Sequence, residues 1–167
     1  MIGNAKKSIV LSTFDLRSDD SGTKIIAALY TAAERGVQVQ ILIDGIYQKL
    51  FLEKSPVFQA LAAHQNVEVG IYNPVTNLMR LNYRMHDKYL IIDESMYLLG
   101  GRNTNDIFLG DKKTRINVDR DIFVYEETQG KGESLQALEK YFDTIWNEAQ
   151  VRKKKKTYAA SYEEKYK

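Results

Sequence analysis

Apolar residues recur along the chain with the two periods that distinguish strands from helices. Short β-branched and apolar runs predict strands, and longer stretches with apolar positions three or four residues apart predict helices. The first strand, helix and strand are spaced as a right-handed crossover unit, which makes the two strands parallel. We expect strands at Ser8–Phe14, Gln38–Asp44, Val67–Tyr72 and Val118–Tyr125, and helices ending near Lys7, over Thr23–Arg35, from Pro56, and over Gly132–Ala149.

The region from Met85 to Asn103 combines two apolar runs with regularly placed polar residues. Its first run, Tyr89–Ile92, is apolar at every position, which is typical of a strand buried on both faces. Side chains two residues apart share one face of a strand, so His86 and Lys88 should project together at the polar start of this run.

The residues after the second apolar run suggest what this region binds. Gly100 and Gly101 allow the backbone to approach a bound group closely or to adopt a positive φ. Asn103 follows with an amide donor. A nucleophile or acid, a cation and a neutral donor that converge on one point indicate a site for phosphate.

The spacing H-x-K, four residues, D, six residues, G-G-x-N resembles the HKD motif of the phospholipase D superfamily. Its chance occurrence is on the order of 10⁻⁸ per starting position. The wider pattern from Ile9 to about Trp146 resembles one catalytic half of such enzymes, most closely cardiolipin synthase-like proteins. The resemblance and the element order imply an α/β domain over residues 1–150, with a mixed or mostly parallel sheet flanked by helices and the motif strand at its centre. The matching residues are His86, Lys88, Asp93, Gly100, Gly101 and Asn103.

The resemblance also implies a mechanism, in which two HKD motifs face each other across one cleft. One histidine attacks phosphorus and the other protonates the leaving oxygen. His86 would take either role, while Lys88 and Asn103 would bind the non-bridging phosphate oxygens. Asp119 stands where the family usually has a glutamate that orients the histidine, and Asp121 is the second choice. Asp93, about 20 Å away along a strand, is expected to be structural.

One motif supplies half of such a site. The partner is expected to be a second HKD half in the same full-length chain, which the abrupt start inside a helix favours, or a second copy of this chain. The expected reaction is hydrolysis of, or phosphatidyl transfer between, phospholipids, with a membrane surface as a further partner. A homodimeric nuclease of the same superfamily and a catalytically silent binding module are the alternatives.

Composition narrows these expectations only slightly. A chain of 167 residues with a formal charge of +2 suits one soluble domain and does not require a nucleic-acid partner. The absence of cysteine excludes disulfides and thiolate metal sites. Lysine and asparagine can stabilise the charge of a phosphate, so we expect neither a metal nor another cofactor.

Several segments carry weaker predictions. Residues 75–84 form either a loop packed on the core or a rim whose Arg80 and Arg84 bind an anionic or lipidic substrate. His64 is expected to be a partly exposed histidine at a helix end. Residues 104–117 are expected to form a loop that could overhang the site. The basic, tyrosine-containing tail, residues 151–167, is expected to be helical or disordered.

Overall fold

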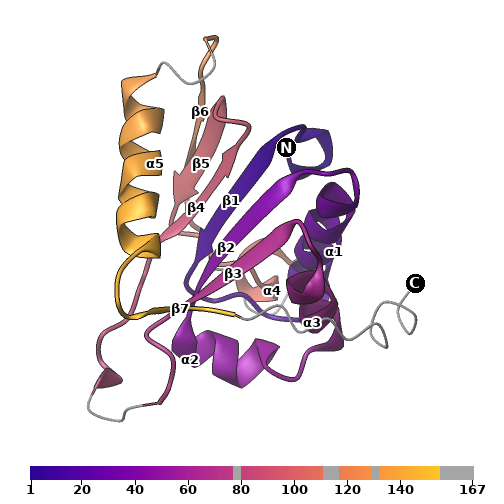
Figure 1. Ribbon diagram of the computed structural model, residues 1–167, viewed down its shortest axis with the longest axis vertical. Coiled ribbons are helices and arrows are strands. Elements are labelled where there is room, and N and C mark those ends of the chain that lie inside the picture. Colours follow the sequence, from indigo (N-terminus) through magenta and orange to yellow (C-terminus); the bar gives the residue numbers. More distant parts are fainter. Residues whose placement is uncertain (77–79, 111–116, 129–131, 155–167) are drawn as a thin grey trace.

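The computed structural model describes residues 1–76, 80–110, 117–128 and 132–154. In this part of the chain, seven strands form one mixed sheet with helices on both faces (Figure 1). Their order across the sheet is β6-β5-β4-β1-β2-β3-β7. The strands are β1 (Ser8–Thr13), β2 (Gln38–Asp44), β3 (Val67–Tyr72), β4 (Lys88–Ile92), β5 (Met96–Gly100), β6 (Asp121–Tyr125) and β7 (Val151–Lys153).

The helices begin where the sequence supplies a cap. The Asp19 carboxylate accepts the Gly22 N–H at the start of α1 (Asp20–Glu34), and Ser55 accepts the Phe58 N–H at the start of α3 (Pro56–Ala63). These two helices cover one face of the sheet, and α5 (Glu133–Trp146) covers the other (Figure 1). The shorter helices are η1 (Ile2–Asn4), α2 (Gly45–Tyr47), the π-helical turn η2 (Gln48–Leu52) and α4 (Asp106–Leu109).

The sheet has a parallel part and an antiparallel part that meet at β1. Strands β1, β2 and β3 are parallel neighbours linked by α1 and α3, as the crossover pattern predicts. Strand β4 runs antiparallel to β1 on its other side, and β5 and β6 continue as antiparallel neighbours. The expected mixed sheet is thus confirmed. The motif strand β4 lies beside the centre and not at it, because β1 occupies the middle position.

Each face of the sheet has its own hydrophobic core. On the α1 and α3 side, Ile9, Ile41 and Phe58 belong to one buried cluster. On the α5 side, a second cluster contains Phe142 and Trp146. Strand side chains alternate between faces, so β4 contributes to both clusters, which confirms a strand buried on both sides.

A tight turn joins β4 to β5 and ties them to the start of β1. Asp93 and Glu94 have φ values of 55° and 51° in this turn. The Asp93 carboxylate accepts hydrogen bonds from the backbone N–H groups of Lys6, Lys7 and Ser8 at 2.7 to 3.1 Å. Burial alone would raise the pKa of Asp93, but these hydrogen bonds outweigh burial and hold it below its usual value.

Three expected elements differ in detail. The N-terminal helix is only the short turn η1. The strand expected from Val118 starts at Asp121, because pairing with β5 begins at that residue. The loop expected over residues 104–117 contains α4, and residues 111–116 lie outside the described part.

The expectation for the start of the tail is wrong, because Val151–Lys153 forms β7, antiparallel to β3. Backbone pairing to an edge strand tolerates lysine side chains, so the lysine run does not prevent a strand. The remaining tail, residues 155–167, lies outside the described residues.

His64 is buried, contrary to expectation. Its Nε2 lies 3.0 Å from Glu34 Oε1, and its Nδ1 accepts the Asn66 N–H, so both ring nitrogens have partners. Among the described residues, no helix is long and apolar enough to cross a membrane.

Candidate active site

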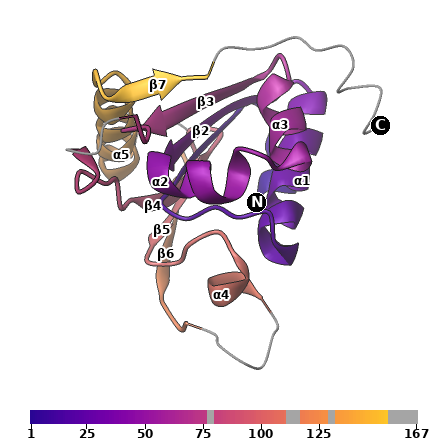
Figure 2. The same ribbon diagram turned by 90° about the horizontal axis from the view of Figure 1, so that it is seen from below.

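The polar residues of the motif gather at one edge of the sheet because of the strand directions. Strand β4 is antiparallel to β1 and to β5, so its amino end lies beside the carboxyl ends of both. Thr13, the last residue of β1, is directly opposite Lys88, the first residue of β4. Figure 2 shows this edge from below, with the segments that follow β1 and β5 lying near α2 and α4.

Lys88 and His86 lie together, as their spacing predicts. Lys88 Nζ is 3.2 Å from His86 Nδ1 and 3.3 Å from His86 Nε2, and it donates a hydrogen bond to the His86 carbonyl oxygen at 2.8 Å. Lys88 is only 7% exposed, whereas His86 is exposed. Burial lowers the pKa of Lys88, although Asp87, Asp119 and Asp15 act in the opposite direction. The ammonium has no ion-pair partner among the described residues, so its charge is available to an anionic ligand.

The aromatic residue that follows β1 packs against both groups. The ring of Phe14 lies 4.5 Å from the His86 ring, centroid to centroid. Lys88 Nζ lies 5.2 Å from the Phe14 centroid. Phe14 therefore limits the positions that the imidazole and the ammonium can take.

Asn103 completes the group that the motif predicts. Its side chain is 9% exposed, and its Oδ1 is buried without a hydrogen-bond partner among the described residues. The oxygen and nitrogen of a side-chain amide exchange places by rotation, so this position can present a donor to a phosphate oxygen. A buried amide without a protein partner is expected where a ligand supplies the partner.

Asn103 is held in place by the residues that follow it. The Thr104 N–H donates to the Asp15 carbonyl at 3.0 Å, and the Thr104 and Thr13 hydroxyls lie 3.1 Å apart. Asn105 Nδ2 donates to the buried Asp15 carboxylate at 2.9 Å, and Arg17 binds the same carboxylate. These bonds join the segment after β5 to the end of β1, so the Asn103 backbone is fixed next to Lys88.

Sequence reasoning did not identify Thr13, Asp15, Thr104 and Asn105 as part of the site. A signal was present, since the apolar strand β1 ends in Ser12 and Thr13 and is followed by Phe14 and Asp15. Buried polar residues at the end of a central strand indicate a site when a motif strand lies next to it. The sequence does not show that the motif strand β4 lies beside β1; only the strand order of the structure does.

The motif glycines Gly100 and Gly101 do not adopt the positive φ that was one of their two expected roles. A Cβ atom on Gly100 would lie 1.9 Å from Asp121 Oδ1, and one on Gly101 would lie 2.0 Å from Asp119 Oδ2. The glycines therefore make room for two carboxylates of the following chain. Whether they also approach a substrate stays a prediction.

The two aspartates do not orient His86 as expected. The Asp119 carboxylate accepts the Arg120 N–H at 2.7 Å, and the Asp121 carboxylate pairs with Arg102 at 3.3 Å. Among the described residues, neither carboxylate bonds to the His86 ring. Asp119 acts on the site through its charge, which favours the protonated form of Lys88.

Arg84 does not face the site, contrary to the rim interpretation. Its guanidinium lies 3.2 Å from the fully buried carboxylate of Asp44 and donates to the Asn73 carbonyl at 3.1 Å. Asp44 also accepts the Met85 N–H at 3.3 Å. This ion pair fixes the backbone immediately before His86. Arg80 is exposed and lines a separate cavity of about 380 Å³ that includes neither His86 nor Lys88.

A second contact fixes the residue between His86 and Lys88. The Tyr141 hydroxyl of α5 donates to the Asp87 carboxylate at 2.8 Å. Burial and this hydrogen bond raise the pKa of Tyr141 to about 12. Tyr141 is partly exposed, and its hydroxyl holds the loop that carries His86.

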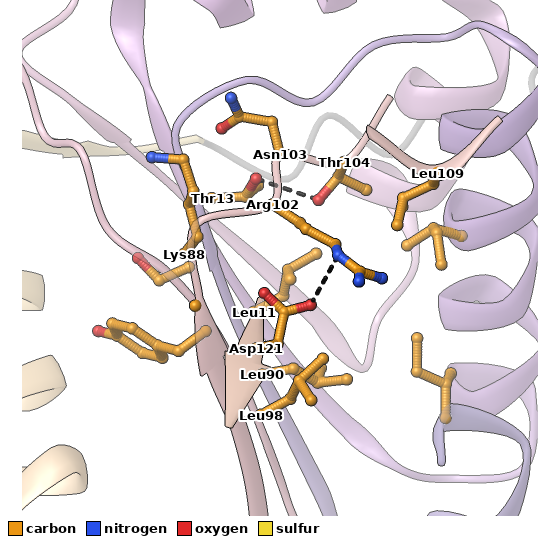
Figure 3. A pocket seen from close by; sticks show the side chains of 15 residues that line it. Leu11, Thr13, Lys88, Leu90, Leu98, Arg102, Asn103, Thr104, Leu109 and Asp121 are labelled. Carbon is orange, nitrogen blue, oxygen red and sulfur yellow. Dashed lines mark hydrogen bonds and ion pairs between the residues drawn. The ribbon is translucent and has the colours of Figure 1, made fainter. Parts of the chain in front are cut away.

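A cavity of about 120 Å³ extends from the motif residues into the space between the sheet and α1 (Figure 3). Lys88 and Asn103 lie on one side of it, and Leu11, Leu90 and Leu98 line the other. The edge thus offers a cation and an amide next to an apolar recess.

Comparison with known proteins identifies the family. The family described as "Cardiolipin synthase, PLD-like domain" matches residues 1–146. Cardiolipin synthase of Clostridium perfringens (strain SM101 / Type A) is 34% identical over 148 residues, which are 89% of this chain and 30% of the relative. Cardiolipin synthase C of Escherichia coli (strain K12) is 29% identical over 133 residues, 71% of this chain and 27% of the relative. The chain thus spans less than a third of the length of these relatives.

A solved structure shows the same fold. The phospholipase D family member Nuc from Salmonella typhimurium has a TM-score of 0.67 and 21% identity, covering 92% of this chain and 86% of that one. The expected resemblance is confirmed by the family match and by the identity to the Clostridium relative. This chain belongs to the PLD-like domain family of cardiolipin synthase.

Proposed function

We propose that this chain supplies one half of a two-histidine site that cleaves or transfers phospholipid phosphodiesters. The observation that carries the proposal is the grouping of His86, Lys88 and Asn103 at one edge of the sheet, with an ammonium that lacks a carboxylate partner among the described residues. Similarity to cardiolipin synthases supports a phospholipid as the substrate.

The proposed reaction has two steps. In the first, a neutral histidine attacks phosphorus, a nitrogen–phosphorus bond forms, and the bond to the leaving alkoxide breaks. The second histidine gives its proton to that oxygen. In the second step, water or an alcohol attacks phosphorus and gives its proton to the second histidine, while the nitrogen–phosphorus bond breaks. Water gives hydrolysis, and an alcohol gives phosphatidyl transfer.

Lys88 and Asn103 would act on the charge that develops in both steps. The non-bridging oxygens gain negative charge as phosphorus is attacked, and donors already in place stabilise that charge without reorganising. The buried ammonium of Lys88 suits this role because its charge is poorly hydrated before the substrate arrives. His86 is exposed, so it can reach phosphorus or a leaving oxygen.

The second histidine must come from outside this chain's own site. The sequence contains two histidines, and the other one, His64, is buried against Glu34 at the end of α3. A second half in a longer protein, or a second copy of this chain, would supply the missing group. The first is supported by relatives that are more than three times as long as the matched region.

Measuring turnover together with the oligomeric state tests the proposal. Light scattering gives the mass of the purified chain, and phosphatidylglycerol and a single-stranded oligonucleotide are offered as separate substrates. We expect lipid turnover only from a dimer or from the chain together with a second half. We expect none from His86→Asn. An active monomer would remove the two-half proposal, and cleavage of the oligonucleotide alone would favour the nuclease alternative. Inactivity of every assembled form would leave the silent binding module.

A further inference from the structure

The segment Gly45–Leu52, which comprises α2 and η2, exposes apolar side chains at the carboxyl end of β2. Leu50 is 67% exposed and Phe51 is 37% exposed. Lys49 and Lys54 flank them and are also exposed. In Figure 1 this segment lies at the lower end of the molecule, which is the end where β1 finishes and β4 begins. The exposed apolar residues therefore lie at the same end as the motif.

A continuous series of ring contacts joins this segment to His86. The Phe14 ring lies 4.5 Å from the His86 ring and 4.5 Å from the Tyr47 ring, and Tyr47 stacks on Phe51 at 6.0 Å. An apolar group attached to a phosphodiester at His86 could follow this aromatic surface outward. Its outer end is Phe51, next to the exposed Leu50.

The charges along the aromatic surface favour a lipid over a nucleic-acid strand. Arg17 lies 4.4 Å above the Phe51 ring, but the Asp15 carboxylate binds it through two nitrogens. Lys49 pairs with Glu53 at 2.7 Å. Binding of single strands combines stacking with unneutralised cations that follow the backbone. Here Arg17 and Lys49, the cations near the outer ring, are paired with carboxylates, whereas Lys88 lies at the inner end of the series beside Phe14. Leu50 offers an aliphatic tip that cannot stack.

Unneutralised cations lie on the other flank of the same segment. A cavity of about 360 Å³ is lined by Gln48 and Lys49 of the segment and by Arg152 and Lys154 after α5. Neither Arg152 nor Lys154 forms an ion pair with the described residues. Lys154 is partly buried over the Phe58 ring and donates a hydrogen bond to Gln59 Oε1. Burial lowers its pKa, although the Glu53 carboxylate, which also lines the cavity, acts in the opposite direction. Binding at the interface of an anionic bilayer combines burial of apolar side chains with attraction of cations to the headgroups, and this segment offers both.

We propose that the α2–η2 segment docks on an anionic phospholipid surface. Leu50 and Phe51 enter between the lipids, and Arg152 and Lys154 contact headgroup phosphates. The inference rests on the proposed function for its substrate class, and it adds the surface by which the domain reaches that substrate. Docking at this end presents the aromatic surface, and His86 behind it, to a lipid that remains in the bilayer.

Flotation with vesicles tests this surface without turnover. All variants carry His86→Asn, and binding is measured on vesicles of phosphatidylcholine with and without phosphatidylglycerol. Leu50→Ser together with Phe51→Ser should weaken binding to anionic vesicles about tenfold or more. Arg152→Ser should weaken it by about fivefold, and only when phosphatidylglycerol is present. The matched control is Ile122→Ser on β6, which removes a side chain that is 65% exposed and should leave binding unchanged.

The single variant Leu50→Ser tests for a folding artefact, because Leu50 is mostly exposed and its replacement should leave the melting temperature unchanged. This variant should still weaken vesicle binding several-fold. Equal binding by the parent and by Leu50→Ser would overturn the proposal, as would an equal loss in Ile122→Ser. Binding to a short single-stranded oligonucleotide that depends on Phe51 would overturn it in favour of a stacking surface. Vesicle binding that depends on Leu50, together with no lipid turnover by any assembled form that retains His86, would keep this surface and remove the proposed function.

Discussion

The buried ion pair between Asp44 and Arg84 gives the sharpest prediction. The Asp44 side chain is fully buried, and Arg84 Nη1 lies 3.2 Å from its Oδ1. Burial raises the pKa of Asp44, while the Ile46 N–H and Arg84 favour its charged form. Arg84→Met removes the cation and leaves a carboxylate in the interior that either stays charged or takes up a proton.

Breaking a buried pair from one side costs about 3–5 kcal/mol of unfolding free energy. For a domain of this size, that loss lowers the melting temperature by roughly 6 to 20 °C. The loss should depend on pH. In the variant, the folded-state pKa of Asp44 lies above the unfolded value of about 3.9, so the folded state binds more protons between these two values. Stability of the variant therefore falls as pH rises, and its deficit is larger at pH 7 than at pH 5.

Urea unfolding followed by tryptophan fluorescence measures this deficit, because Trp146 is the single tryptophan and is buried beside Phe142. The matched control is Arg80→Met, which changes an exposed arginine four residues earlier and should stay within about 0.5 kcal/mol of the parent. A loss below about 1 kcal/mol in Arg84→Met at pH 7, or an equal loss at pH 5, would refute the reasoning.

Three further predictions concern the site and its anchor. Lys88→Met should lower turnover by about 10² to 10³-fold. It should keep or raise the melting temperature, since an apolar side chain replaces a buried ammonium. A large loss of stability would contradict this. Asp93→Asn should lower the free energy of unfolding by about 1–3 kcal/mol at pH 7. Because the pKa of Asp93 is lowered on folding, the difference from the parent should vanish as pH falls through that pKa. A pH-independent difference in urea unfolding would count against this reasoning. Turnover should survive a chelator, because Lys88 and Asn103 are placed to stabilise the charge on a phosphate without a divalent ion. Loss of activity that a divalent ion restores would disprove this.

Local patterns predicted the elements well where one physical cause dominates. Strands β2 and β3 and the start of α3 have the predicted bounds, because apolar alternation and a Ser-Pro cap act over a few residues. The pairing of His86 with Lys88 followed in the same way from a spacing of two.

Contacts between distant segments were beyond the reach of sequence patterns. From the sequence, Arg84 could be an arginine that binds substrate. Only the structure shows that its guanidinium is buried against Asp44 at the end of β2. Asp119 and Asp121 looked suited to orient His86, but the close approach of their segment to Gly100 and Gly101 directs both carboxylates elsewhere. The tail strand β7 likewise depends on an open edge of β3 that no local signal reveals.

The central position of β1 has a consequence for partial unfolding. The residues of the site come from both sides of the β1–β4 junction, with Thr13 and Phe14 on the parallel side and Lys88 and Asn103 on the antiparallel side. The parallel part has its own core against α1 and α3, so it can remain folded while β4, β5 and β6 open as a unit. Such an opening would dismantle the site without global denaturation. In hydrogen exchange, amides of β5 and β6 should then lose protection before those of β2, and a bound second half would slow that exchange first.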